Sequence, residues 1–424
     1  MAKIGIASAD ITPKESVWLT GYGSRDHKSE GVYQSMIAGA VAISGDTDEV
    51  LIYTADLIGY GSAYAAAAKA RIAEATGLLP DQVVLTATHT HCAPFFSPWA
   101  MPGEIEEAYA TFLEDELVKL GIAAKHQQVE GEVAFSRGHS EFGVSRRLPD
   151  GTGGVRFAPN PDGPMDRDLD TLWFKNKAGK LIGSLTIFGC HPTSRGGYFI
   201  GGDYPGFLCR ALSEQTGAPA FFATGCAGNI RPWFKGENEG FNTPTLEALE
   251  AASRKMAEEV MASHQDITPV PADTLQVASE FHQLPYAEMP DAATFSDNAE
   301  NHSNRLIRCW ASEMLKLIEA GGLPNSCPQE IQVVQFNPEL RAVFLGGEVL
   351  TEIGMHIKTV LQPSTTITVA YSNGLIAYVP SKETYDLGGY EVNGSHFYFL
   401  KPAPFAKEIE DLIVEKTAEV VKKL

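Results

Sequence analysis

Three short segments of the sequence carry side chains that commonly bind transition metals. The first reads Thr-His-Thr-His-Cys over residues 88–92 and directly follows an apolar run, so His89 and His91 are two positions apart. In extended backbone, residues i and i+2 point to the same side of the chain, which allows both imidazoles to reach one site. The alternative interpretation is a pair of structural histidines that are hydrogen-bonded within a loop.

The other two segments contribute one histidine and one glutamate. His191 lies in Cys-His-Pro after the apolar run 181–188, and Glu348 lies in Gly-Gly-Glu after a further apolar run. Open α/β sheets place their sites at the carboxyl ends of strands, and each segment stands where a predicted strand ends. Two imidazoles and a carboxylate with one open position form a known catalytic zinc arrangement. We therefore predict zinc ligation by His89, His191 and Glu348, although a glutamate after two glycines is also a common surface residue.

Two glycine-rich segments lie close to these residues in the sequence. Residues 201–206 precede a predicted helix, and we expect Asp203 to cap that helix, with orientation of a histidine ligand as the alternative role. Residues 225–232 follow a predicted strand and offer backbone N–H groups to an anion. Cys226 in this segment has no neighbouring base, which disfavours a role as nucleophile.

The elements that position these segments alternate between β-like and helical runs, which is typical of an α/β protein. We expect mixed β-sheets flanked by helices, and two sheets in four layers are one arrangement that fits. A helix is predicted over residues 62–76 with Ser62 as its N-cap, and one long helix over residues 294–320. Residues 148–166 are predicted to form a long loop. Residues 284–328 have no assigned role, and a pocket wall and a subunit interface both stay open.

Composition limits the class of protein. The chain has 424 residues and a formal net charge of −20. Such a surface repels phosphate groups, which disfavours nucleic acids and anionic membranes as partners. No apolar stretch approaches 18 residues, so no transmembrane segment is predicted. We expect a small-molecule substrate as the partner, and the sequence leaves the oligomeric state open.

The beginning of the chain and its cysteines predict the cellular compartment. Ser8 and Asp10 interrupt the first apolar run too early for a signal peptide. The six cysteines form no Cys-X-X-Cys pair and no dense framework, so free thiols are expected. Both observations predict a cytoplasmic protein.

These motifs, in this order, resemble the neutral (non-lysosomal) ceramidase family. Any one match is weak, but five matches in register over most of the chain are fairly specific. The Thr-His-Thr-His motif is among them, as is a tyrosine-rich segment in the last quarter of the chain. The matching segments are residues 5–13, 88–91, 188–193 with 202–204, 347–348, and 373–391.

The resemblance implies a zinc-dependent amidohydrolase with the fold of the ceramidase catalytic domain. It also implies four metal ligands and three groups that act on the substrate. Without the resemblance, Tyr378 would be interpreted as an ordinary aromatic residue of a β-strand, and Arg146 as a solvated charge. The implied ligands are His89, His191, Glu348 and Tyr378, and the implied substrate groups are His91, Arg146 and Tyr390.

Two departures from the family pattern bear on the substrate. Ceramidases carry a serine in a Gly-Asp-Val-Ser-Pro stretch, whereas residues 228–232 here read Gly-Asn-Ile-Arg-Pro, which places Arg231 at the serine position. Because arginine suits carboxylates and phosphates, we expect Arg146, Arg231 and Tyr390 to hold a polar or anionic part of a small substrate. The second departure is the missing C-terminal immunoglobulin-like domain, so residues 1–424 are expected to form a single catalytic domain.

The hypothesis from the sequence is a zinc-dependent hydrolase that cleaves an amide or related acyl bond through a metal-activated water. Ceramide itself is not the expected substrate, because Arg231 replaces the family serine. Two alternatives stay open. One is a binding or sensing protein that kept the metal pocket and lost catalysis, and the other is a protein whose histidines are structural and bind no metal.

Overall fold

The computed structural model describes residues 2–236 and 239–424, and a curved mixed sheet of nine strands forms its centre. Its strands are β1 (Lys3–Asp10), β3 (Ile37–Ser44), β4 (Glu49–Ala55), β5 (Val83–Ala87), β6 (Val129–His139), β9 (Asp168–Asn176), β10 (Leu181–Phe188), β12 (Ala220–Thr224) and β14 (Thr268–Val270). Eight of them follow the order β12-β10-β9-β6-β1-β3-β4-β5, and β14 pairs with β6. The sheet curls so far that β12 packs near β4 and β5, which brings the carboxyl ends of β5 and β10 together.

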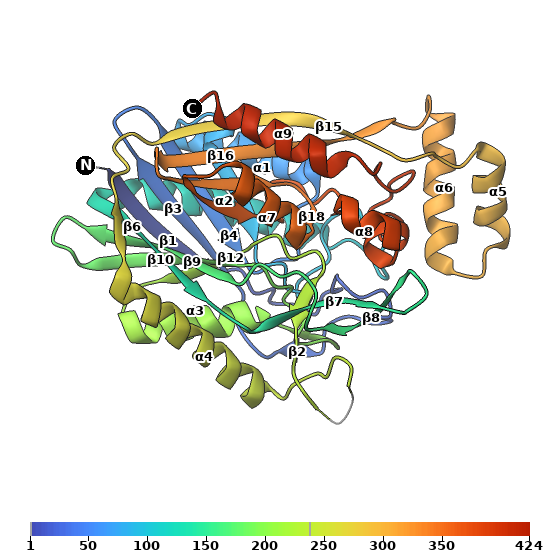
Figure 1. The fold of residues 1–424 in the computed structure, drawn as a ribbon, viewed down its shortest axis with the longest axis horizontal. Helices are drawn as coiled ribbons and strands as arrows, with labels where there is room; N and C mark the ends of the chain where they lie inside the picture. Colours follow the sequence, from blue (N-terminus) through green and yellow to red (C-terminus); the bar gives the residue numbers. More distant parts are fainter. Residues whose placement is uncertain (1, 237–238) are drawn as a thin grey trace.

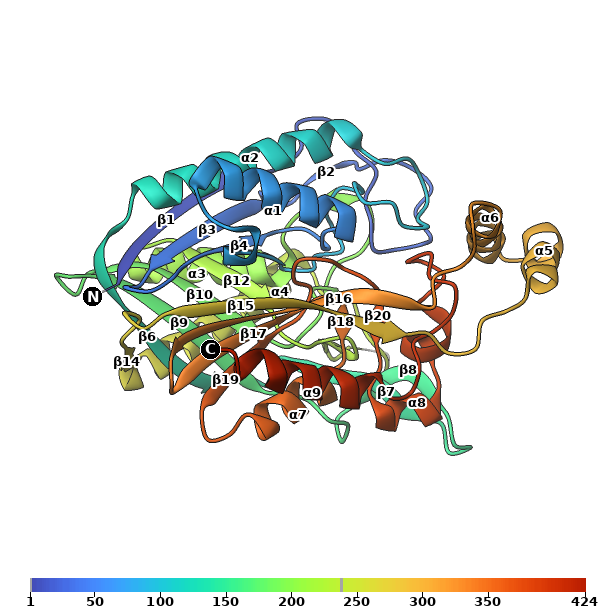
Figure 2. The same ribbon diagram turned by 90° about the horizontal axis from the view of Figure 1, so that it is seen from above.

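Four helices cover the outer face of this sheet, namely α1 (Ser62–Thr76), α2 (Glu107–His126), α3 (Asp203–Thr216) and α4 (Leu246–Ser263). The first two pack over β1, β3, β4 and β5 (Figure 2), and the last two over β6, β9, β10 and β12. In β4, Leu51 and Tyr53 point to the helices, whereas Val50 and Ile52 point to the opposite side. Burial on both faces explains the nearly continuous apolar runs of the sequence.

A second sheet of four strands covers the inner face. Its strands, in hydrogen-bonding order, are β15 (Gln276–Pro285), β16 (Ser326–Asn337), β17 (Leu340–Leu345) and β19 (Thr365–Val369). Val334 and Phe344 of this sheet share one core with Ile52 and Leu185 of the first sheet. The helices on its far face are α7 (Thr351–Val360) and α9 (Ile409–Val421) (Figure 2). The mixed sheets, flanked by helices in four layers, confirm the predicted fold class.

Short elements complete the fold, namely β2 (Gly31–Val32), β11 (Phe199–Ile200), β18 (Glu348–Val349), β20 (Tyr378–Val379), α8 (Lys382–Leu387) and a π-helical turn (Tyr390–Gly394). β2 pairs with β11, and β18 pairs with β20, in parallel. The register of the second pair places Glu348 beside Tyr378. Two candidate ligands from distant parts of the sequence are therefore fixed next to each other by backbone pairing.

Residues 148–166, predicted to be a loop, contain part of an antiparallel hairpin. β7 (Gly143–Pro149) pairs with β8 (Val155–Asn160), and β13 (Ile230–Pro232) pairs with β7 on its other edge. Asp150 shapes the turn, because its carboxylate accepts hydrogen bonds from two backbone N–H groups of the turn. The loop prediction was wrong because β8 is held by pairing with β7 and is too exposed to show an alternating apolar pattern.

Residues 294–320, predicted to be one helix, form two helices, α5 (Ala292–Asn301) and α6 (Arg305–Glu319). The backbone becomes extended at His302. Asn304 then caps α6, because its side-chain oxygen accepts a hydrogen bond from the backbone N–H of Leu306 (2.9 Å). The prediction was wrong because this cap interrupts an otherwise helical pattern. The two helices form a hairpin that projects from the layers, with a small apolar cluster of its own (Figures 1 and 2).

Two predicted N-caps are displaced by one residue. Gly61 caps α1, which begins at Ser62, and Gly202 caps α3, which begins at Asp203. The Asp203 carboxylate accepts hydrogen bonds from the backbone N–H of Tyr204 (2.6 Å) and from that of Arg195 (2.9 Å), which anchors the loop after His191. Among the described helices, none combines the length and apolar character needed to cross a membrane.

The six cysteines are free thiols in the structure. Burial raises the pKa of the Cys226 thiol to about 12. A thiol with such a pKa stays protonated near neutral pH, and the thiolate is the nucleophilic form. The structure therefore gives Cys226 the character of a core side chain.

Candidate metal centre

His89, His191 and Glu348 leave three different strands and meet at one buried point. His191 Nε2 lies 3.0 Å from Glu348 Oε2, and His89 Nε2 lies 3.3 Å from the same oxygen. The Tyr378 hydroxyl lies 3.2 Å from His191 Nε2. All four predicted ligands are buried, so the structure brings the complete set together away from solvent.

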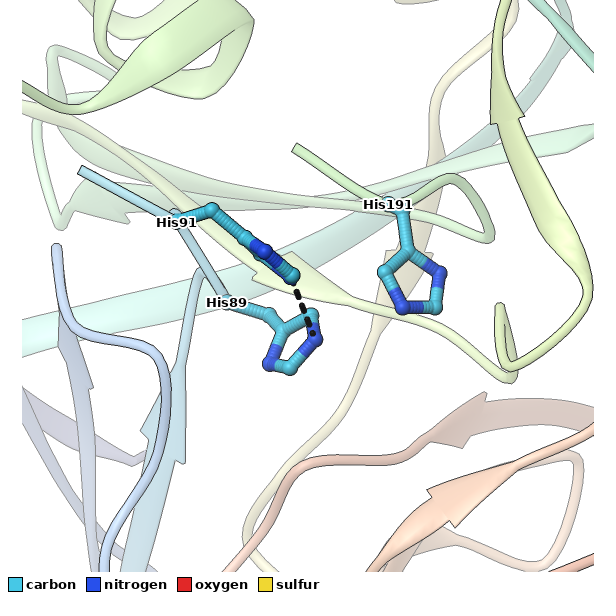
Figure 3. Close-up of side chains that lie close together, drawn as sticks. All are labelled: His89, His91 and His191. Carbon is cyan, nitrogen blue, oxygen red and sulfur yellow. Dashed lines mark hydrogen bonds between the residues drawn. The ribbon is translucent and has the colours of Figure 1, made fainter. Parts of the chain in front are cut away.

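His91 belongs to the same cluster. Its Nε2 lies 3.3 Å from His89 Nε2, and the ligand atoms of His89, His91 and His191 all lie within 4.8 Å of one another. Figure 3 shows the three rings turned toward one another, two from the segment after β5 and one from the segment after β10. His91 was predicted to act on the substrate, and the structure places it as close to His89 as Glu348 is.

The backbone around the histidines determines which ring nitrogen carries the hydrogen. His89 Nδ1 donates to the Ile58 carbonyl oxygen (2.5 Å), and His91 Nδ1 donates to that of Gly21 (3.1 Å). His191 Nδ1 donates to the carbonyl oxygen of Ala227 (2.6 Å). Because a carbonyl oxygen only accepts hydrogen bonds, each Nδ1 carries the hydrogen and each neutral ring presents an unprotonated Nε2 to the centre.

This donor set fits a zinc ion. Unprotonated nitrogens of His89 and His91 face each other at 3.3 Å, beside a buried carboxylate, and such an arrangement of electron pairs requires a positive charge. Imidazole and carboxylate are typical zinc ligands, and histidine ligands commonly donate their second N–H to a backbone carbonyl. A bound cation would supply that charge.

The electrostatic environment favours the ionisation states that metal ligands need. Burial lowers the pKa of His191 to about 4 and that of His91 well below its usual range. Burial raises the pKa of Glu348, but the neighbouring histidines outweigh it and hold that pKa well below its usual range. His91 and His191 are therefore neutral and Glu348 ionised near neutral pH.

The peptide backbone at His89 is strained. Its φ is 65°, in the left-handed region that residues other than glycine rarely adopt. Such a conformation persists only where the surroundings hold it, and it is common at functional sites. Here the hydrogen bond to Ile58 and the burial of the ring fix the direction in which the imidazole leaves β5.

Arg146 and Tyr390, predicted to act on the substrate, lie beside Tyr378. Arg146 Nη2 donates to the Tyr378 hydroxyl (3.1 Å), and the Tyr378 and Tyr390 rings are 5.4 Å apart at an angle of 73°. Tyr390 keeps 41% of its surface exposed, so it stands where a ligand can reach it. The structure therefore places both residues at the cluster.

Two charged residues at the site were missed from the sequence. Glu391 forms a buried ion pair with Arg146 (2.7 Å) through one carboxylate oxygen and with Arg147 (2.6 Å) through the other. The only available signal was the position of Glu391 next to Tyr390, in a segment that matches the ceramidases. Spacing gave no hint of the pairing, because it joins residues more than 240 positions apart.

Arg231 lies beside the segment that carries His191. Ile230, its neighbour in β13, accepts a hydrogen bond from His191 Nδ1 through its carbonyl oxygen (3.1 Å). Arg231 Nη2 donates to the Thr193 carbonyl oxygen (3.0 Å), and its guanidinium lies 4.3 Å from the centre of the Phe241 ring. The predicted site residue is thus adjacent to the cluster without touching the four candidate ligands.

A small cavity lies over the cluster and has largely aromatic walls. His91, Glu348 and Tyr378 line it. Gly21 permits this approach, because its φ is 96° and a Cβ atom there would lie 2.6 Å from His91 Nδ1. Tyr378 and Tyr390 were predicted, whereas the other aromatic wall residues, Trp99, Tyr398 and Phe399, were missed from the sequence. The other lining residues include Trp99, Met101, Leu375, Tyr390, Tyr398 and Phe399.

Solved structures of ceramidases share this fold. The neutral ceramidase from Pseudomonas aeruginosa matches with a TM-score of 0.75 and 19% identity, over 99% of this chain and 74% of that chain. A ceramidase complexed with C2 matches with a TM-score of 0.74 and 20% identity, over the same shares of the two chains. No protein-family model and no curated protein sequence matches the chain. These likenesses confirm the predicted neutral ceramidase-like fold.

Proposed function

We propose that the chain is a zinc-dependent hydrolase that cleaves an amide or a related acyl bond. One observation carries the proposal: three imidazoles, each with its hydrogen on Nδ1, direct bare Nε2 atoms at one point beside a buried carboxylate. A zinc ion in such a set supplies Lewis acidity and lowers the pKa of a water molecule toward neutrality. The ceramidase-like fold supports hydrolysis as the reaction class.

His89, His191 and Glu348 are the proposed ligands, and the Tyr378 oxygen is the proposed fourth. Arg146 supports this role of Tyr378, because its guanidinium donates to the phenolic oxygen and stabilises negative charge there. Glu391 holds Arg146 in place, because its carboxylate pairs with Nε on the other side of the guanidinium. The ion pair therefore positions a ligand without contacting the reacting atoms.

His91 is the proposed proton carrier. Its Nδ1 is engaged by the Gly21 carbonyl oxygen, its Nε2 faces the cluster and the cavity, and its lowered pKa keeps it neutral. Nε2 accepts a proton from the attacking water and passes it to the leaving nitrogen. Tyr390 and the other aromatic walls hold the substrate and exclude bulk water.

The packing supports the proposal that the described residues form a single catalytic domain. Both sheets contribute to one hydrophobic core, and the metal cluster takes ligands from both. A division into two independent units would separate His191 from Glu348. The catalytic site would then lie between domains rather than within one.

The test measures metal content and turnover in the same preparations. Elemental analysis of the wild-type protein should give about one zinc per chain, and an amide and ester panel should give turnover that chelation abolishes and zinc restores. His89→Ala should lose both. His139→Ala, an exposed histidine paired with Glu141, is the matched control and should keep both.

Other outcomes have defined meanings. Stoichiometric zinc without turnover on any amide or ester would favour a binding or sensing protein. A chain that takes up no zinc even after reconstitution would contradict the proposal and leave the histidines with structural roles.

A further inference from the structure

Arg231 carries a positive charge that forms no ion pair in the part of the chain that the structure describes. Among residues 2–236 and 239–424, no carboxylate lies within ion-pairing distance of it, and its one hydrogen bond goes to the Thr193 carbonyl oxygen. Its Nε is buried without an acceptor in the described chain. Burial lowers the pKa of this guanidinium, which reflects the cost of removing a charge from water.

Two aromatic rings hold the guanidinium in position. It lies 4.3 Å from the centre of the Phe241 ring and 5.4 Å from that of Phe157. Stacking on aromatic rings orients an arginine and leaves its N–H edge available for a planar anion. The position is therefore built for a ligand rather than for a mobile surface charge.

The register of the three-stranded sheet directs Arg231 toward the metal cluster. Arg231 in β13 pairs with Val144 in β7, and Arg146 lies two residues farther along β7, on the same face of the sheet. The Arg146 guanidinium lies 5.7 Å from the centre of the Phe157 ring, so both arginines contact one ring. Because Arg146 reaches Tyr378, this face is the one that looks at the cluster.

The two arginines differ in their charge balance. Arg146 shares Glu391 with Arg147, whereas Arg231 has no such partner among the described residues. Arg25, near the same cluster, donates only to carbonyl oxygens in the described chain, including that of His91 (2.8 Å). In a chain of net charge −20, this side of the site is locally positive.

We propose that Arg231 binds a carboxylate group of the substrate, so that the preferred substrates are amides that also carry a carboxylate. The inference rests on the proposed hydrolase function. In the reaction, water adds its oxygen to the amide carbon, the C–N bond breaks, and one water proton goes to the leaving nitrogen. The substrate carboxylate stays intact and remains with one of the two products.

The test compares amides that differ only in charge. N-Hexanoylglycine and N-hexanoylglycinamide carry the difference on the amine portion, and N-hexylsuccinamic acid and N-hexylsuccinamide carry it on the acyl portion. Wild-type protein should prefer the charged member of one pair by roughly 10- to 100-fold in kcat/KM, the range for a hydrogen bond to a charged group. The pair that shows the preference identifies the portion that carries the carboxylate.

Arg231→Gln should remove that preference by raising KM for the charged amide at least roughly tenfold more than KM for the neutral amide. Arg341→Gln is the matched control, because Arg341 likewise forms no ion pair among the described residues, its Nη2 donates to Ser364 Oγ (2.9 Å), and it lies on β17 at the end away from Glu348. It should keep the preference. The Arg341 variant thus shows the general effect of replacing an arginine that forms no ion pair and lies outside the site.

A binding measurement separates the subsite from catalysis. Calorimetry with N-(hexylsulfonyl)glycine, which has no amide to hydrolyse, should show binding to the wild type and the Arg341 variant and a loss of at least roughly tenfold in the Arg231 variant. Neutral and charged amides cleaved equally, with no effect of Arg231→Gln, would overturn the inference and keep the hydrolase. Binding through Arg231 without hydrolysis of any amide would support the subsite and contradict the hydrolase.

Discussion

His191 Nε2 lies 3.0 Å from Glu348 Oε2, although 157 positions separate the two residues in the chain. β10 of the nine-stranded sheet delivers the histidine, and β18, which follows β17 of the second sheet, delivers the glutamate. The contact therefore joins the two sheets at their carboxyl ends. Because the set exists only when the sheets are packed, we expect metal binding and folding to be coupled.

Removal of zinc is expected to destabilise the folded chain. A ligand that binds only the folded state stabilises it by RT ln(1 + [L]/Kd), which is about 4 kcal/mol when free zinc is 1,000-fold above Kd. Urea unfolding of the zinc-loaded protein with and without chelator measures this difference. In Glu348→Gln the difference should shrink, because the only carboxylate among the proposed ligands is lost.

Falling pH should weaken zinc binding and therefore the stability that zinc adds to the folded chain. Folding lowers the pKa of His191 from its usual 6.5 to about 4, so its ring stays neutral in the folded chain down to that pH. Protons compete with zinc for Nε2 only as the pH approaches 4. Zinc affinity measured by competition titration should therefore fall below about pH 4 by up to about tenfold per pH unit, and an affinity that does not fall between pH 4 and pH 3 would contradict the assignment of His191 as a ligand.

Glu391 should contribute strongly to stability. Glu391→Gln leaves two buried guanidiniums without their counter-charge, and breaking a buried ion pair from one side costs about 3–5 kcal/mol. Turnover should also fall, because Arg146 no longer holds the Tyr378 hydroxyl. Urea unfolding and kcat of the variant measure the two effects.

The matched control is Glu141→Gln. Glu141 also contacts two basic side chains, Arg167 and His139, but it is largely exposed. Exposed pairs contribute little, so the expected loss is below about 1 kcal/mol. Equal losses in the two variants would show that burial of the Glu391 pair is unimportant.

The sequence predicted the parts of the site that depend on local context. His89, His191 and Glu348 each follow an apolar run that ends at a sheet edge, and a strand can be recognised from its own residues. Tyr378 and Arg146 could be named only through the resemblance to ceramidases, since nothing in their surroundings marks them. Their positions depend on β18 pairing with β20 and on the hydrogen bond from Arg146 of β7 to the Tyr378 hydroxyl.

The remaining features arise from contacts between distant segments. The ion pairs of Glu391 and the aromatic cavity walls join loops that no periodic pattern connects. The helix over residues 294–320 was mispredicted for the opposite reason, because one local cap at Asn304 outweighs a pattern that is helical on both sides. The hairpin of β8 was missed since pairing with β7, rather than burial, stabilises it.

Asp56 should make stability depend on pH. Burial raises its pKa from 3.8 to about 7, although hydrogen bonds from the Ile37 N–H and the Thr88 hydroxyl oppose the shift. Between about pH 4 and 7 the folded chain keeps a proton that the unfolded chain has lost. This contribution to stability is therefore complete below pH 3.8 and is lost as the pH rises through 7.

Asp56→Asn removes this titration. The unfolding free energy of the variant, relative to the wild type, should increase with pH by at most about 1.4 kcal/mol per unit between pH 4 and 7. The asparagine can accept from the Ile37 N–H and donate to the Thr88 hydroxyl, so both contacts survive. Asp297→Asn, on the exposed face of α5, controls for the loss of a carboxyl group, and parallel pH profiles of all three proteins would refute the prediction.

Gly21 should be needed for the position of His91 rather than for the fold. An alanine Cβ at Gly21 would lie 2.6 Å from His91 Nδ1, which forces the imidazole away from the cavity. The change also places a side chain at a φ of 96°, which costs about 1 kcal/mol. Turnover of Gly21→Ala should therefore fall roughly 100-fold, the lower end of the range for loss of a general acid–base group.

Gly153→Ala separates the two effects. Gly153 has a φ of 99°, and an added Cβ would meet no atom of the described chain within 4 Å. The two variants should lose similar stability in urea unfolding, but only Gly21→Ala should lose turnover. If Gly21→Ala kept wild-type kcat, His91 would not need its present position, and the proton-carrying role would have to pass to another group at the cluster.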